Sequence, residues 1–487
     1  MKPIGGLRGV IAILLLMSAA ALAQSGTRAR QDAVPYLRGV HPTMSADLPD
    51  LGDATVYRLD WTLDGTQLTA TEEVRVTNYS AEAWHELYFL LLPNRIGGRM
   101  TVGDLQVNGE AVSPGFAGDE TVMRVDLPVQ LKPGEAATVK LDYRLAVPET
   151  GGGNYGILAL DEGVLSLAHA YALLAVHDSE GWDVDLPPRY GDLVYARSSF
   201  FRVRLDAPAS LGVAASGDLI EWNLEGGRQI VEFAAGPVRD FYLAAGEEWE
   251  QIVRAQDGVT VRAYARPENR ALMERAVETA LRSLSLFGDL YGHYPFRELD
   301  LVPITTSALG VEFPGIIAIR RELIEEDQRI LLESTVAHEV GHQWFYSLVG
   351  NDQVSEPWLD ESVTQYLTMR YYREVYGEPG YRLFRQGLLE RWEQIGRNRL
   401  PIGLPVGRYS GSEYGAVIYG LGPLVVERLA QMVGDSTFDG FINDYVERNA
   451  FGIATTLEFR QLAEEHCDCS LQQFFEEWVL PRPSARR

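Results

Sequence analysis

The chain has 487 residues, of which 46% are hydrophobic and 23% charged, so it is long enough for two or three domains with apolar cores, and disorder is not the default expectation. Its formal net charge of −25 at pH 7 repels nucleic acid and anionic lipid, so neither is expected as a partner. We attribute the negative charge mainly to the solubility of an exported protein.

The N-terminus has the features of an export signal. Lys2 and Arg8 precede an apolar run, and Ala-Leu-Ala at positions 21–23 is the small-residue pattern of a signal peptidase site. The run is shorter than the roughly 20 residues that a membrane-spanning helix needs. We therefore predict a signal peptide over residues 1–23, then a linker over 24–50. The mature protein is expected to be exported, periplasmic or secreted, without stable membrane insertion; an uncleaved anchor is the alternative.

Residues 51–250 are predicted to form a β-rich domain. In VYRLDWTLD (56–64) and TVKLDYRLAV (138–147), apolar residues alternate with polar ones, which is the period of a half-buried strand. Turn-rich segments such as LKPGEA separate these runs. We expect an antiparallel β-sandwich.

The pattern changes near residues 250–270, where we place a domain boundary. The segment ALMERAVETALRSLSLFGDLYG (271–292) has apolar residues at spacings of three and four, which predicts a long amphipathic helix. Most of the later sequence is also helical in pattern, and none of it is expected to span a membrane. The predicted fold is multidomain α+β, with a mostly helical domain over 251–480 and a tail over 481–487.

Two cysteines, Cys467 and Cys469, occur in the chain. A bridge between residues two apart is strained, and no second cysteine pair exists to complete a zinc site. We expect either two incidental thiols or a local strained bridge.

The stretch AHEVGHQWF (337–345) predicts a metal site. His338 and His342 are four residues apart, so on a helix they lie on one face and can bind one ion. Glu339 lies beside them, within reach of a water. A catalytic zinc takes three protein ligands, and Glu361 is our third. It follows an eighteen-residue gap, early in a helix whose start is marked by Ser355 and Pro357.

Other carboxylates near these ligands have less certain roles. We expect Asp360 to be a solvated helix carboxylate, as is common for such residues. A histidine ligand usually has its other nitrogen held by a carboxylate or a carbonyl. Glu333 and Asp360 are candidates for that contact, and the sequence does not choose between them.

HEVGH, the gap and WLDES resemble the zinc site of the aminopeptidase N family, thermolysin-like gluzincins whose pattern is HExxH followed by WLNEGFA. Residues 309–313, LGVEF, resemble the family's GAMEN-type motif, which binds the free amine of the substrate. The resemblance implies that Glu312 and Gly310 bind substrate, although the motif's first glycine and its asparagine are replaced here. A structural glutamate paired with Arg320 is the alternative for Glu312.

A catalytic tyrosine of this family opens a Y-x-x-G-A segment. YGLGPLVVERL is similar to it, with Tyr419 on the tyrosine and Gly422 on the glycine. Tyr414 is the competitor, and a packed core tyrosine is the bland alternative for Tyr419.

The resemblance implies one Zn²⁺ held by His338, His342 and Glu361, with Glu339 as general base and Tyr419 as oxyanion donor. The implied activity is that of an aminopeptidase acting on peptides with a free N-terminus. A zinc endopeptidase and a non-catalytic binding module of the same fold are the alternatives. The sequence ends at Arg487, so we expect the large C-terminal helical domain of longer members to be absent and the cleft to be open.

Overall fold

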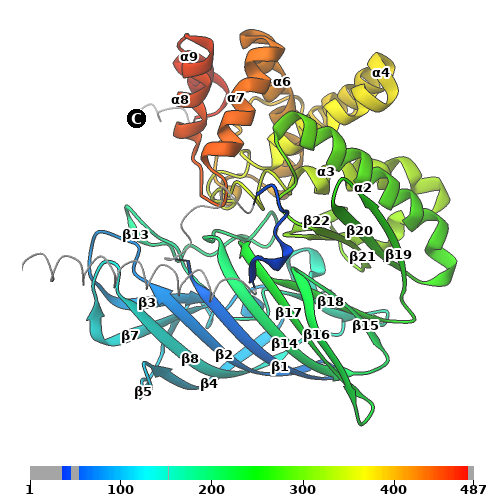
Figure 1. The fold of residues 1–487 in the computed structure, drawn as a ribbon. Helices are drawn as coiled ribbons and strands as arrows, with labels where there is room; N and C mark the ends of the chain where they lie inside the picture. Colours follow the sequence, from blue (N-terminus) through cyan, green and yellow to red (C-terminus); the bar gives the residue numbers. More distant parts are fainter. Residues whose placement is uncertain (1–35, 45–53, 152, 481–487) are drawn as a thin grey trace, which may run out of the picture.

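The computed structural model describes residues 36–44, 54–151 and 153–480. The predicted signal peptide, most of the linker and the tail lie outside these residues. β-Sheets form one half of the molecule, and the helices from α2 onward form most of the other half (Figure 1). The predicted fold class, α+β with a β-rich part followed by a helical part, is confirmed.

The β-rich part is built on an eight-stranded sheet with the order β16-β17-β14-β1-β2-β8-β4-β5. Both strands that the alternating pattern predicted are present, and along β1 each apolar side chain from Tyr57 to Leu63 is buried while its neighbours are exposed. One pair departs from the antiparallel expectation, because β1 and β14 run parallel. The strands are β1 (Val56–Asp64), β2 (Gln67–Thr77), β4 (Arg99–Val107), β5 (Glu110–Ala111), β8 (Ala136–Ala146), β14 (Ser199–Pro208), β16 (Asp218–Glu225) and β17 (Arg228–Val238).

Two four-stranded sheets complete this part, with the orders β15-β18-β10-β9 and β11-β3-β7-β6. Tyr57 on β1 accepts a hydrogen bond at 2.9 Å from the backbone N–H of Leu174 on β11, so the inner face of the large sheet packs on a smaller one, as in a sandwich. The strands are β3 (Trp84–Leu90), β6 (Gly115–Ala117), β7 (Val122–Leu131), β9 (Leu158–Asp161), β10 (Val164–Ala168), β11 (Leu173–Leu174), β15 (Leu211–Ala215) and β18 (Tyr242–Glu247), beside the hairpin β12 (His177–Asp178) and β13 (Gly181–Trp182).

A five-stranded sheet in the second part was not predicted. Its order is β19-β20-β21-β23-β22, and the pairs β20/β21 and β21/β23 are parallel. Parallel strands are buried on both faces and read as continuous apolar runs, so LDLVPI and IIAI carry no alternating signal. The strands are β19 (Glu250–Gln256), β20 (Val259–Ala265), β21 (Glu298–Ile304), β22 (Gly310–Phe313) and β23 (Ile316–Arg320).

The helices follow this sheet in the chain, and α2 (Arg270–Tyr291) has almost the bounds that the sequence predicted. The others are α3 (Arg329–Gly341), α4 (Glu361–Glu393), α5 (Gly411–Ala416), the π-helix η9 (Val417–Leu421), α6 (Gly422–Val433), α7 (Asp435–Arg448), α8 (Thr456–Cys467) and α9 (Gln472–Trp478). Short 3₁₀ turns are η1 (Tyr36–Gly39), η3 (Leu92–Asn94), η4 (Asn154–Gly156), η5 (Pro267–Asn269), η6 (Arg321–Leu323), η7 (Glu326–Gln328) and η8 (Val406–Arg408).

The start of α4 corrects the prediction based on Ser355 and Pro357. The helix begins at Glu361, and the carboxylate of Asp360 caps it by accepting the Glu361 N–H at 2.8 Å. The backbone N–H of Ser355 donates to the carboxylate of Asp352 at 2.9 Å, so Ser355 belongs to a separate turn before the helix. An aspartate side chain can replace a backbone hydrogen bond in such a turn. Asp360 is 1% exposed, so the expectation that it is solvated was wrong.

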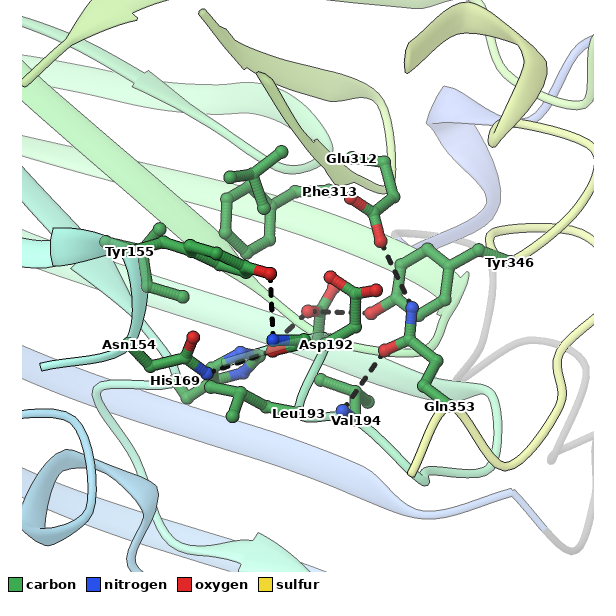
Figure 2. A pocket seen from close by; sticks show the side chains of 14 residues that line it. Asn154, Tyr155, His169, Asp192, Leu193, Val194, Glu312, Phe313, Tyr346 and Gln353 are labelled. Atoms are coloured by element: carbon green, nitrogen blue, oxygen red, sulfur yellow. Dashed lines mark hydrogen bonds and ion pairs between the residues drawn. The ribbon is translucent and has the colours of Figure 1, made fainter. Parts of the chain in front are cut away.

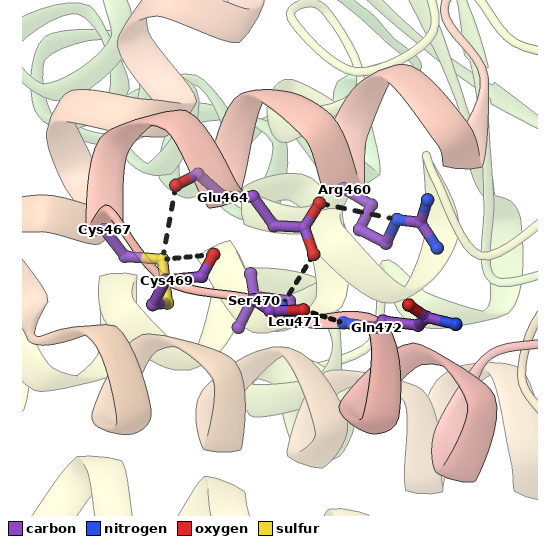
Figure 3. Close-up of a disulfide and its surroundings, with 7 residues drawn as sticks. All are labelled: Arg460, Glu464, Cys467, Cys469, Ser470, Leu471 and Gln472. Atoms are coloured by element: carbon purple, nitrogen blue, oxygen red, sulfur yellow. Dashed lines mark hydrogen bonds and ion pairs between the residues drawn. A yellow bond between two sulfur atoms is a disulfide. The ribbon is translucent and has the colours of Figure 1, made fainter.

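Two further expectations are resolved in the C-terminal part. Gly411–Val433 is long and apolar enough to span a membrane, contrary to our expectation, but 72% of that window is buried inside the protein, as in a core helix. Cys467, the last residue of α8, forms a disulfide with Cys469 in the link to α9 (Figure 3), so the local bridge is the alternative that the structure contains.

Candidate metal centre and active site

Three side chains from α3 and α4 converge on one point. His338 lies on the last turn of α3, His342 is the C-cap residue directly after that helix, and Glu361 is the first residue of α4. The Nε2 atoms of the two histidines are 3.1 Å apart, and each lies 3.2 or 3.4 Å from Glu361 Oε2. Ligand atoms around a tetrahedral zinc ion with bonds of 2.0–2.1 Å are separated by about 3.3 Å. The spacing of the three atoms therefore fits a zinc ion.

The outer nitrogen of each histidine is held by an oxygen. His342 Nδ1 lies 3.0 Å from the carbonyl oxygen of Phe345, which can only accept, so Nδ1 carries the hydrogen. The Thr368 hydroxyl donates to the Thr364 carbonyl and lies 3.4 Å from His338 Nδ1, so it can only accept there. Both Nε2 lone pairs consequently face the carboxylate of Glu361, and three acceptors in contact fit a cation.

Neither carboxylate that we considered for this contact makes it. Glu333 instead accepts from the hydroxyl groups of Tyr371 and Tyr376. Asp360 caps α4 and accepts from Gln353. The carbonyl oxygen of Phe345 and the hydroxyl group of Thr368 make these contacts with the two histidines. Neither group belongs to a sequence pattern by which it could have been predicted.

The pKa shifts of His342 and Glu361 also indicate that a positive charge is stabilised between these residues. Burial alone would lower the pKa of His342, but Glu312 and Glu361 outweigh it and raise this pKa well above its usual value. Burial would raise the pKa of Glu361, and the two histidines instead lower it well below its usual range. Glu361 is therefore an anion that needs a cationic neighbour, a proton or a metal ion.

Glu339 lies beside this centre with a free carboxylate oxygen. The residue is 3% exposed, and its Oε2 has no hydrogen-bond partner among the residues that the structure describes. Burial raises the pKa of Glu339 well above its usual value. An open carboxylate oxygen beside the metal site can accept a proton from a water, and a raised pKa makes it a stronger base.

Gly310, predicted on substrate, packs directly on this carboxylate. A Cβ at position 310 would lie 2.6 Å from both Cγ and Cδ of Glu339, closer than van der Waals contact permits. The absence of a side chain at Gly310 therefore lets β22 approach Glu339.

Glu312 lies on the same strand and faces the centre. Its carboxylate lies within 4.8 Å of ligand atoms of Glu339 and His342. Oε1 accepts a hydrogen bond at 3.1 Å from Gln353, whereas Arg320 is paired with Glu322 at 3.5 Å. The alternative of a Glu312–Arg320 ion pair is therefore not seen. Burial raises the pKa of Glu312.

Asp192 is a site residue that sequence reasoning missed. It comes from the segment between β13 and β14 of the β-rich part, and its carboxylate lies within 4.8 Å of those of Glu312 and Glu361. Figure 2 shows it between Tyr155 and Gln353, below Glu312. Its Oδ2 is buried without a partner among the described residues, and burial raises its pKa well above the usual value. The surrounding RYGDLVYAR carries no motif that could have identified it.

Tyr419 and Tyr414 both border the centre. The Tyr419 hydroxyl donates to Glu361 Oε1, and burial raises its pKa well above the usual value. The Tyr414 hydroxyl is buried without a partner among the described residues, with the two rings 5.9 Å apart. Tyr419 lies in a π-helix, a form that is frequent at functional sites. Gly422 follows, where a Cβ would lie 2.6 Å from Ser362 Cβ, so it allows this segment to approach α4.

These residues line a cavity of about 790 Å³. Asp192, Glu312, Glu339 and the metal ligands form its acidic part. Leu331, Leu383, Phe384 and Leu388 are among its apolar lining. Such a combination of apolar walls and a few convergent polar groups is typical of a ligand site.

Comparison with known proteins matches residues 275–478 to the peptidase family M1 domain. Aminopeptidase M1-B of Oryza sativa subsp. japonica is 24% identical over 297 residues, which are 57% of this chain and 34% of that protein. Aminopeptidase RNPEPL1 of Homo sapiens is 29% identical over 217 residues, 40% of this chain and 29% of that protein. This chain thus spans about a third of the length of these curated relatives.

The fold is similar to a crystal structure of the M1 zinc metallopeptidase from Deinococcus radiodurans. The TM-score is 0.65 at 22% identity, covering 88% of this chain and 95% of the other, so the likeness extends over both the β-rich and the helical part. With the metal ligands on α3 and α4 inside the matched segment, residues 275–478 of this chain are a peptidase family M1 domain.

Proposed function

We propose that this protein is a zinc-dependent aminopeptidase that releases N-terminal residues from peptides. The observation that carries the proposal is the arrangement of four carboxylates around one histidine pair. One carboxylate completes a metal site, one has an open oxygen for a water, and Glu312 and Asp192 lie beside them. The M1 relatives, which carry the name aminopeptidase, support it.

His338, His342 and Glu361 would hold the zinc ion. When bound, zinc supplies Lewis acidity, which polarises the substrate carbonyl and makes water a nucleophile near neutral pH. The chain's own part in this is to present two nitrogen lone pairs and a carboxylate oxygen 3.1–3.4 Å apart, held by the contacts at the two Nδ1 atoms.

Glu339 acts as general base. Its open Oε2 takes a proton from the attacking water, and the same carboxylic acid then gives that proton to the leaving amine nitrogen. The raised pKa of Glu339 suits the first step, because an ordinary glutamate is a weaker base and takes a proton from water less readily.

Tyr419 donates to the oxygen on which negative charge develops. Its raised pKa keeps the phenol protonated and therefore able to donate. In the ground state the hydroxyl donates to Glu361, so it stands next to the metal site and would exchange one anionic acceptor for another. Such a donor typically lowers the barrier by about 3 kcal/mol.

Glu312 and Asp192 would bind the α-ammonium of the substrate. Two carboxylates within 4.8 Å repel each other when ionised, and an ammonium group between them offsets that repulsion. An internal peptide bond offers no such charge. This pair is our reason for preferring an aminopeptidase to an endopeptidase on the same scaffold.

The decisive experiment offers the zinc-loaded protein one set of peptides with free and with acetylated N-termini. We expect hydrolysis of the free set alone, with release of single N-terminal residues. Glu339→Gln serves as the inactive control. Cleavage of both sets would mean an endopeptidase, and cleavage of neither set would favour a non-catalytic binding module.

We further propose that the protein works outside the cytoplasm, after cleavage of the predicted signal peptide and without membrane insertion. The support is the pattern at residues 1–23 alone. N-terminal sequencing of the protein recovered from its native cells tests this, and a mature chain that begins at Met1 would contradict it.

A further inference from the structure

The large cavity contains one cationic side chain that the proposed chemistry does not use. Arg391, near the C-terminal end of α4, is the only arginine or lysine among the described residues that line this cavity. Its guanidinium group has no hydrogen bond or ion pair in the described part of the chain. Burial lowers the pKa of Arg391, but an arginine remains charged. Arg391 is half-buried and has no anionic partner among the described residues, so its guanidinium group can bind an anion that enters the cavity.

The position of Arg391 indicates where that anion would lie. Its guanidinium carbon is 5.8 Å from the centre of the Tyr419 ring, and this ring is 6.1 Å from the His338 ring. Glu312 lies instead beside His342, the other histidine ligand. The proposed ammonium site thus adjoins His342, whereas Arg391 adjoins the Tyr419 ring next to His338. This arrangement fits a peptide that is held by its amine at Glu312 and runs past the metal site toward Arg391.

A short peptide is long enough to extend from the metal site to Arg391. One residue extends a peptide by about 3.5 Å, so a carboxylate one or two residues beyond the scissile bond reaches a group adjacent to Tyr419. A guanidinium binds a carboxylate through two parallel N–H···O bonds, which gives both affinity and orientation.

We propose that Arg391 binds a substrate carboxylate on the leaving side of the scissile bond and is a specificity-determining residue. The carboxylate has two possible sources, the C-terminus of a di- or tripeptide or the side chain of an aspartate or glutamate after the scissile bond. This inference rests on the proposed aminopeptidase function. It makes short peptides with a free C-terminus, or peptides with an acidic second residue, the preferred substrates.

Binding to the inactive Glu339→Gln protein, loaded with zinc, separates recognition from turnover. Dissociation constants are measured by titration calorimetry for Ala-Phe against Ala-Phe amide, and for Ala-Glu amide against Ala-Gln amide. The first pair tests the C-terminal carboxylate and the second tests the side chain. We expect the charged member of at least one pair to bind about tenfold to a hundredfold more tightly, as for a charge-assisted hydrogen bond.

For each pair, the ratio of the dissociation constant of the uncharged peptide to that of the charged peptide is then measured for the Arg391→Gln and Arg391→Lys variants of the same protein. Arg391→Gln should bring the ratio close to one, and Arg391→Lys should retain part of it, since lysine keeps the charge but not the fork. Arg382→Gln is the matched control. It removes the same charge from the same helix, at a residue with 68% of its side chain exposed. It should leave the ratio unchanged, and thermal melting checks that each variant folds.

A ratio near one for both pairs in the Glu339→Gln protein, or a ratio that Arg391→Gln does not change, overturns the inference. If Arg391 only positioned Tyr419, Arg391→Gln in the otherwise unmodified protein would lower kcat for the acid and the amide alike and leave the binding ratios as they were. Hydrolysis of Ala-Phe amide by the unmodified protein tests the proposed function separately. Its absence, together with no binding of any peptide, would remove both proposals.

Discussion

Gly310→Ala tests the placement of Glu339, the proposed general base, with the smallest possible change. The new Cβ would lie 2.6 Å from Cγ and Cδ of Glu339, whereas carbon atoms at optimal separation are about 3.5–4.0 Å apart. Either the carboxylate or β22 must therefore move by about 1 Å. A displacement of that size in a reacting group can lower the rate about a hundredfold. We expect kcat to fall by this factor while the zinc content stays the same, because the three atoms nearest to the added Cβ all belong to Glu339 and none belongs to a metal ligand.

The assay is kcat on a peptide amide with a free N-terminus, together with zinc content by atomic spectroscopy. The matched control is Gly288→Ala in α2, where no heavy atom lies within 4 Å of the added Cβ, and we expect normal kcat. Overpacking also costs about 1–3 kcal/mol of unfolding free energy, so the measurements belong well below the melting temperature. Full activity of a folded Gly310→Ala protein would refute the reasoning, because Glu339 would then not need its present position.

Three further variants test the metal site and the core. Glu361→Gln should lower the zinc content after dialysis against a chelator, because it removes an anionic ligand; equal zinc retention would contradict its role. Burial raises the pKa of Glu72 to about 8, so between about pH 4.5 and 8 the folded protein holds a proton that the unfolded chain has lost, and stability falls as pH rises. Glu72→Gln should therefore reduce the loss of stability between pH 5 and 8 in urea unfolding, and an unchanged pH slope would contradict the assignment. Arg239 is buried and donates to the carbonyl groups of Tyr346, Ala196 and Leu348; Arg239→Met leaves them unpaired and should lower the unfolding free energy by about 3–5 kcal/mol, and a loss under 1 kcal/mol would show that these bonds contribute little.

The parts of the fold that were predictable are those in which burial leaves a period in the sequence. Strand β1 buries alternate residues, and α2 buries one face, so both patterns are visible in the letters. Strands β21 and β23 are buried almost completely, and such a run has no period. The sheet that carries Glu312 was therefore hidden, although Glu312 itself was identified by resemblance.

The residues of the candidate site also fall into two groups, those that a sequence pattern could predict and those that it could not. His338, His342, Glu339 and Glu361 have fixed spacings within or between two helices, so the sequence could predict that they meet. Asp192 meets them only because the β-rich part folds against the helical part, and no local pattern encodes that contact. Backbone groups are equally invisible, as the carbonyl oxygen of Phe345 at His342 shows.

In the proposed function, the acidic centre connects metal binding with the recognition of a free N-terminus. Asp192, Glu312 and Glu361 lie within 4.8 Å of one another, and burial raises the pKa of the first two. A metal ion at the histidines compensates Glu361, but Asp192 and Glu312 still lack a cation of their own. An α-ammonium supplies that charge, and an acetylated N-terminus does not. The discrimination between free and blocked peptides would therefore follow from the pairing of an ammonium group with the ionised forms of these two carboxyl groups, so it should weaken when Asp192 or Glu312 is replaced by its amide.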